Sequence, residues 1–129
     1  MSEFVPASAK DLFDRMCVWT DLRGTISYDE TKQSMTWILA DDLRLDIAIF
    51  DLEGWIEVFD SPEARHMSLT HWHPEAEEIY EQMLKINAGR IRFPYINSLF
   101  GKIILDVGEE YPKRKHRFRA VHYLGEENE

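Results

Sequence analysis

The chain has 129 residues, of which 44% are hydrophobic, 12% aromatic and 30% charged, and its formal net charge is −9. This composition excludes an intrinsically disordered chain, which has few aromatic residues and low hydrophobicity, and the single cysteine, Cys17, excludes a scaffold held by disulfides. The length fits one domain with its own hydrophobic core, since single domains typically hold about 100–150 residues.

Membrane insertion and secretion are both disfavoured by the sequence. A transmembrane helix needs about 20 apolar residues, and the clearest aliphatic run here is residues 47–50. Charged residues interrupt residues 1–20, so we expect no secretory signal. With one cysteine, these features predict a cytoplasmic protein. Cys17 lies in an apolar helical pattern, so we expect a buried structural thiol rather than a nucleophile.

The first predicted element is an amphipathic helix over residues 8–20. Ser8 can cap its N-terminus, with Asp11 near the positive end of the helix dipole, and Gly24 marks the exit. The apolar positions recur with the 3.6-residue period of a helix. They are Leu12, Phe13, Met16 and Trp19.

Residues 25–60 predict a four-stranded meander, because apolar and polar residues alternate in runs separated by short polar turns. Turns this short force antiparallel neighbours, since a parallel crossover needs about a dozen residues or more. We expect Gly54 to supply a positive φ where the third turn closes. Trp37 and Trp55 fall on predicted strands, where they could stack across the sheet.

A short strand over residues 66–71 and a second helix over residues 74–88 are expected next. Pro74 suits the first helical position, and glutamates crowd the first turn, where the helix dipole favours negative charge. Residues 90–100 give no clear pattern, because Pro94 interrupts an aromatic stretch.

Two more strands are predicted toward the C-terminus, over residues 101–107 and 118–124, with residues 108–117 as the loop between them. Residues 125–129 hold three glutamates and are expected to form a disordered acidic tail. The elements together predict an α+β fold in a single domain, residues 1–129, in which one antiparallel sheet carries both helices on one face.

One candidate metal site stands out in the sequence. Two histidines at positions i and i+2 of a strand point to the same face, which suits chelation of zinc, iron or manganese. Glu75 or Glu78 is an alternative third ligand, and the other interpretation is ordinary: one histidine caps the helix and the other is half-buried. The candidate metal ligands are His66, His71 and His73.

Four carboxylates near the third turn, Asp46, Asp51, Glu53 and Glu57, are a second candidate cluster. Paired carboxylates can perform acid/base chemistry when burial separates their pKa values. A solvated turn and strand face explains them more simply, and Asp46 and Glu57 would repel each other as cross-strand neighbours. We therefore assign no catalytic residue, and whether the protein is an enzyme stays open.

A basic cluster is the candidate partner-binding surface. Its residues could contact nucleic-acid phosphates, an acidic protein partner, or only the acidic bulk of the same chain. The net negative charge disfavours nucleic acid. The candidate partner-binding residues are Lys113, Arg114, Lys115, Arg117 and Arg119.

Charge and size favour a small non-catalytic interaction protein as the function. Residues 1–89 hold 18 acidic and 7 basic side chains. Such a surface suits an inhibitor of a basic protein partner, with fast and salt-sensitive association. A metal-dependent enzyme or metal-binding domain at the histidine segment is the alternative, and a domain that binds a small apolar ligand between helix 74–88 and the sheet is the third. No cofactor other than a divalent metal ion is implied, and the protein is expected to be a monomer or homodimer.

Overall fold

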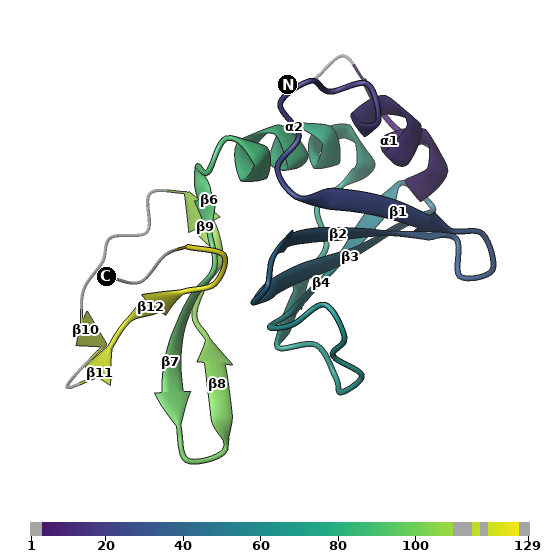
Figure 1. Ribbon diagram of the computed structural model, residues 1–129. Helices are drawn as coiled ribbons and strands as arrows, with labels where there is room; N and C mark the ends of the chain where they lie inside the picture. The colour runs from purple at the N-terminus through teal and green to yellow at the C-terminus, as the bar shows by residue number, and fades with distance from the viewer. Residues whose placement is uncertain (1–3, 110–114, 117–118, 127–129) are drawn as a thin grey trace.

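The computed structural model describes residues 4–109, 115–116 and 119–126. Two helices and a five-stranded antiparallel sheet form the main body, and smaller sheets follow toward the C-terminus (Figure 1). The predicted α+β fold is confirmed. No helix in these ranges is long and apolar enough to cross a membrane.

Helix α1, Ala9–Met16, is shorter than the helix predicted from the apolar period. Ser8 caps it as expected, because its side-chain oxygen accepts a hydrogen bond from the Asp11 amide at 3.3 Å. Cys17 follows as the C-cap residue and is exposed, so the expectation of a buried thiol is wrong. The helix buries Ala9, Leu12 and Met16, and Cys17 lies outside that narrow buried face.

The predicted meander is confirmed, with each strand paired to the next in chain order. A fifth strand, β5, adds to the free edge of β4 and begins later than the sequence indicated. The strands are β1 (Thr25–Asp29), β2 (Ser34–Ala40), β3 (Leu43–Phe50), β4 (Glu53–Phe59) and β5 (Thr70–Trp72).

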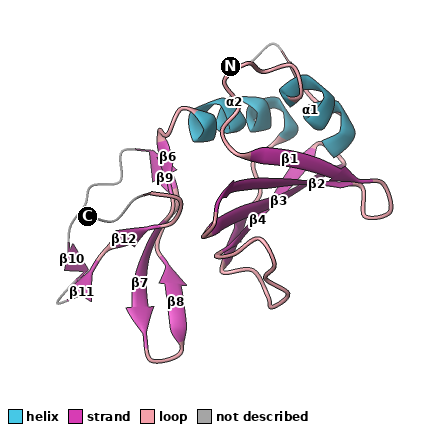
Figure 2. Ribbon diagram, viewed as in Figure 1, coloured by secondary structure: helices cyan, strands magenta, loops and turns pink. Residues whose placement is uncertain are grey.

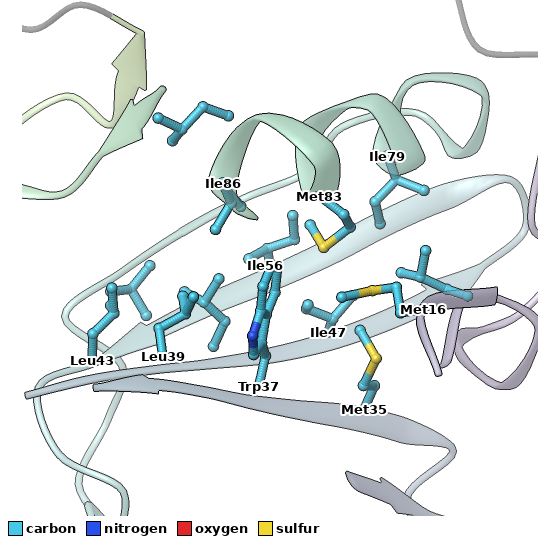
Figure 3. Close-up of a cluster of buried hydrophobic side chains, with 14 of the residues drawn as sticks. Met16, Met35, Trp37, Leu39, Leu43, Ile47, Ile56, Ile79, Met83 and Ile86 are labelled. Atoms are coloured by element: carbon cyan, nitrogen blue, oxygen red, sulfur yellow. The ribbon is translucent and has the colours of Figure 1, made fainter. Parts of the chain in front are cut away.

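Both helices lie over one face of this sheet, which we call the inner face; the opposite face is the outer face (Figure 2). Helix α2, Ala76–Asn87, buries Ile79, Met83 and Ile86 against the inner-face residues of the strands. Figure 3 shows these side chains around Trp37, which is fully buried. The interface between α2 and the sheet is filled by side chains.

Trp37 and Trp55 do not stack across the sheet. Trp37 lies on the inner face, where its Nε1 donates to the Arg23 carbonyl at 2.7 Å and its ring contacts Trp19. Trp55 lies on the outer face and is 45% exposed. Neighbouring strands place their side chains by register, and this register puts the two rings on opposite faces.

The C-terminal third forms separate small sheets, so the expectation of one sheet is corrected. One has the order β12-β7-β8, and the others pair β6 with β9 and β10 with β11. Pro94 begins β7 instead of preventing a strand, because its position at the strand start is one that proline tolerates. The strands are β6 (Ile91–Arg92), β7 (Pro94–Ser98), β8 (Gly101–Ile104), β9 (Gly108–Glu109), β10 (Lys115–His116), β11 (Arg119–Ala120) and β12 (His122–Tyr123).

Two residues of the expected acidic tail contact the body of the protein. The Gly125 amide donates to the Asp42 carboxylate at 2.9 Å, and Glu126 pairs with Arg92 at 3.7 Å. The remaining tail residues, 127–129, lie outside the described residues.

Candidate functional site

The turn between β3 and β4 is strained at its centre. Asp51 and Leu52, the two central residues of the turn, have φ values of 51° and 64°, so both have a left-handed backbone conformation. Positive φ at both positions is the pattern of a type I′ hairpin turn, whose second residue is commonly glycine. Leu52 instead takes that position, at a cost of roughly 1–2 kcal/mol for a residue with a Cβ. Its side chain is 70% exposed, so burial does not offset the strain.

Gly54 does not take the positive φ that the sequence led us to expect. It is a glycine because two segments meet there: a Cβ at this position would lie 2.7 Å from Ile79 Cδ1 and 2.8 Å from the Pro74 carbonyl oxygen. The Gly54 amide donates to that same oxygen at 2.7 Å. Close backbone approach, rather than turn conformation, therefore requires the glycine.

A hollow of about 610 Å³ opens beside this turn. Three segments that are distant in the sequence enclose it: the N-terminal segment, the β3–β4 turn, and the junction between β5 and α2. The lining residues are Val5, Asp51, Leu52, Glu53, His73, Glu75, Ala76 and Glu77.

Backbone and aromatic contacts hold these walls together. The Leu52 carbonyl accepts from the Ala76 amide at 2.9 Å, which fixes the turn to the first residue of α2. Phe4 packs edge-on against Tyr80 of α2, with ring centroids 5.1 Å apart, and this contact places Val5 at the rim. These contacts therefore define the shape of the hollow.

Four carboxylates surround the hollow without a cation beside them. Asp51, Glu53, Glu75 and Glu77 form no ion pair with any residue in the described part of the chain. The dipole of α2 explains why Glu75 and Glu77 lie at the start of the helix. It does not explain the carboxylates of Asp51 and Glu53 at the β3–β4 turn. Glu53 and Glu75 even form an isolated antiparallel bridge, which sets two like charges opposite each other.

The structure brings His71 and His73 together on the outer face. His71 Nδ1 and His73 Nε2 lie 3.0 Å apart and share a hydrogen bond. The Trp55 ring packs against His73 with a centroid distance of 4.2 Å. Glu57 lies directly opposite His71 in the register between β4 and β5.

His66, the third expected metal ligand, is not placed beside this pair. Its Nε2 lies 3.4 Å from the Asp60 carboxylate, and its Nδ1 lies 2.6 Å from the Met67 carbonyl. Within residues 4–109, 115–116 and 119–126, no three His, Cys, Asp or Glu side chains are arranged to hold a metal ion. The predicted three-ligand centre stays a prediction, with two of its members in contact.

Asp46 is a cross-strand neighbour of Glu57, as the sequence suggested. Its carboxylate accepts from Thr36 Oγ1 at 3.2 Å and pairs with Arg44 at 3.2 Å. Burial raises the pKa of Asp46 above its usual value, and the negative charge of Glu57 adds to that rise, whereas Arg44 and Thr36 oppose it. Desolvation of the charged form is the dominant cause.

The predicted partner-binding cluster lies mostly outside the described residues. Lys115 belongs to β10 and Arg119 to β11, and these two strands pair with each other. Lys113, Arg114 and Arg117 fall in the ranges that the structure does not describe.

Sequence reasoning did not find the hollow, because its walls meet only in three dimensions. The sequence around Asp51 and Glu53 predicts a solvated turn, and no pattern in the sequence indicates that this turn lies near Val5. One signal was present: an Asp-Leu pair fills the centre of a two-residue turn, where Asp-Gly is the common choice. Comparisons of this chain with known protein families, with characterised proteins and with solved structures find no match.

Proposed function

We propose that this is a non-catalytic binding protein whose hollow docks a basic segment of a protein partner. The observation that carries the proposal is the set of four carboxylates around the exposed, strained Leu52 that have no ion-pair partner among the described residues. Strain held at an exposed side chain points to a function for that side chain, because folding alone gains nothing from it.

Lysine and arginine side chains have the chemistry that fits this hollow. Their charged ends would pair with the carboxylates, and their aliphatic stems would cover Leu52 and Val5. The volume of about 610 Å³ lies within the range of roughly 300–1,000 Å³ that binding clefts occupy, so it has room for at least one such side chain.

An inhibitor of a basic protein is one form of this function. Complementary charge would steer the two proteins together and raise the association rate more than the final affinity. The cytoplasm is the proposed location, since the exposed and unpaired Cys17 suits a reducing compartment.

The test uses a short peptide of alternating lysine and leucine as the probe. The variant Glu53→Gln/Glu75→Gln/Glu77→Gln removes three charges from the hollow and should weaken peptide binding at least tenfold by isothermal titration calorimetry. The matched control, Glu30→Gln/Asp41→Asn/Glu63→Gln, removes three exposed charges elsewhere and changes the net charge equally.

The control should retain affinity within about threefold, since distant exposed charges are largely screened. Equal losses in both triple variants would mean that net charge alone attracts the peptide, and the hollow would then not be its docking site. A peptide of alternating glutamate and leucine should not bind; if it bound as tightly, the role of charge would be excluded.

A further inference from the structure

We infer that His71 and His73 chelate a divalent late transition metal ion on the outer face of the sheet, with Glu57 as the carboxylate ligand. This site shares His73 with the rim of the hollow, but it binds a metal ion rather than a protein and does not require a docked partner. The three residues come from two neighbouring strands and the segment that follows β5.

The distance between the two ring nitrogens is the first support. His71 Nδ1 and His73 Nε2 lie 3.0 Å apart. Two imidazole nitrogens bound to one Zn²⁺ at about 2.0–2.1 Å lie roughly 2.9–3.4 Å apart, for angles at the metal between ~90° and ~109°. The pair has the separation of two ligands of one ion, and a rotation of the rings would turn both lone pairs toward a common point.

The two side chains are kept close together without a metal, and only the orientation of their rings must change on binding. Strand pairing fixes the backbone of His71, and the Trp55 ring packs against His73 with an interplanar angle of 71°. A chelate formed from a preorganised pair loses less conformational freedom on binding than one formed from mobile side chains.

Glu57 is the carboxylate best placed to join the pair. Side chains directly opposite each other on antiparallel strands have Cβ atoms about 4.5–5.5 Å apart. Glu57 does not stand with the two histidines as a formed three-ligand group among the described residues, so its exposed side chain would turn toward an ion that His71 and His73 hold. Glu57 is exposed and forms no hydrogen bond or ion pair with any described residue. Asp46, its neighbour on β3, is engaged by Arg44 and Thr36 instead.

The tautomer that His73 must adopt limits the affinity of this site for the metal ion. When Nε2 binds a metal, the neutral ring carries its proton on Nδ1, which is buried and has no hydrogen-bond partner among the described residues. An unpaired buried donor lowers the affinity by roughly ten- to a hundredfold. We therefore expect an exchangeable ion. Imidazole ligands favour Zn²⁺, Ni²⁺ or Cu²⁺ over Mg²⁺ and Ca²⁺.

The experiment is calorimetric titration of the full chain with ZnCl₂ in the absence of any peptide. We expect one ion per chain and no binding of Mg²⁺. His71→Ala and His73→Ala should each weaken Zn²⁺ binding at least tenfold, and Glu57→Gln should weaken it several-fold. His66→Ala is the matched control, because it removes another exposed histidine, and it should leave the affinity unchanged.

Circular dichroism checks that each variant is folded, and His71→Gln replaces His71→Ala if the latter is not. Failure of the unchanged protein to bind Zn²⁺ would overturn the proposal, as would unchanged affinity in the His71→Ala/His73→Ala double variant. If His66→Ala weakened Zn²⁺ binding as much as His71→Ala, the proposal would also be overturned, because the loop over residues 60–69 would then take part in holding the ion. Unchanged affinity in Glu57→Gln alone would remove Glu57 from the ligands.

Discussion

At the scale of single residues, two positions near β3 and β4 depart from ordinary local chemistry. Leu52 holds a left-handed backbone while its side chain faces solvent. Asp46 keeps a half-buried carboxylate on the outer face, beside the like charge of Glu57. Each is a local cost to folding, and each can be relieved by one substitution.

Leu52→Gly should stabilise the protein and weaken docking at the same time. The change creates an Asp-Gly turn and removes left-handed strain, so we expect the free energy of unfolding to rise by about 1 kcal/mol. Urea denaturation measures this gain, and titration with the lysine–leucine peptide measures the loss of the apolar contact. A variant that binds the peptide as well as the unchanged protein would contradict a role for Leu52 in docking.

Asp46→Asn should raise stability at neutral pH and not at acidic pH. Burial raises the pKa of Asp46 in the folded state, so the folded protein binds this proton more tightly than the unfolded chain does. The charged carboxylate therefore lowers the stability of the unchanged protein above its folded-state pKa, and this cost disappears below the unfolded value of about 3.9.

Thermal melts of both proteins across this pH range, with a chelator present, check the prediction. The melting temperature of Asp46→Asn should exceed that of the unchanged protein at pH 7, and the two should converge as the pH falls toward 4. A difference that grows on acidification would show that Arg44 and Thr36 outweigh the desolvation of the carboxylate.

At the scale of elements, the contact between the β3–β4 hairpin and the start of α2 sets the shape of the hollow. Two backbone hydrogen bonds join them, from Gly54 to Pro74 and from Ala76 to Leu52. The contact is possible because Gly54 leaves room for Ile79 and for the Pro74 carbonyl. The helix is therefore anchored to the sheet at its first turn as well as through its buried face.

Gly54→Ala should destabilise the protein by about 1–3 kcal/mol, the usual effect of overpacking a filled site. Urea denaturation measures the change. Ile79→Val removes the nearest side-chain atom, so the double variant should be less destabilised than the two single changes added together. Simple additivity would show that the added methyl group does not meet Ile79, and the Pro74 carbonyl oxygen would then be the only steric cause left.

At the scale of the whole molecule, charge is segregated along the chain. Residues 1–89 carry the acidic excess, whereas residues 90–124 hold 8 basic and 3 acidic side chains. The hollow belongs to the acidic part, so the surrounding field adds to the attraction of its four carboxylates for a basic segment.

Association with the lysine–leucine peptide should therefore depend on ionic strength. We expect the association rate, measured by stopped flow, to fall roughly tenfold between low and physiological salt, because screening shortens the reach of the field. The dissociation rate should change much less. An association rate that is the same at low and physiological salt would count against electrostatic steering.

The sequence by itself determined those helices and strands that depend on patterns among neighbouring residues. Alternation of apolar and polar residues, with turns too short for a crossover, determined the antiparallel meander over residues 25–60. The helical period located α2 near its observed bounds, although Pro74 lies before the N-cap Glu75 and not at the first helical position as predicted. The i and i+2 spacing of His71 and His73 placed both rings on one face. Pairing of Asp46 with Glu57 followed from the same register.

Only the tertiary structure decided how distant segments meet. The placement of Val5 and the β3–β4 turn around one hollow, the separation of His66 from His71, and the division of the C-terminal strands into small sheets all depend on the path of the whole chain. The spacing of apolar residues predicts which side of a helix or strand faces the core. It does not predict which other element packs against that side. Gly54 shows the reason: the atoms that require a glycine there belong to Pro74 and Ile79, some twenty residues away in the sequence.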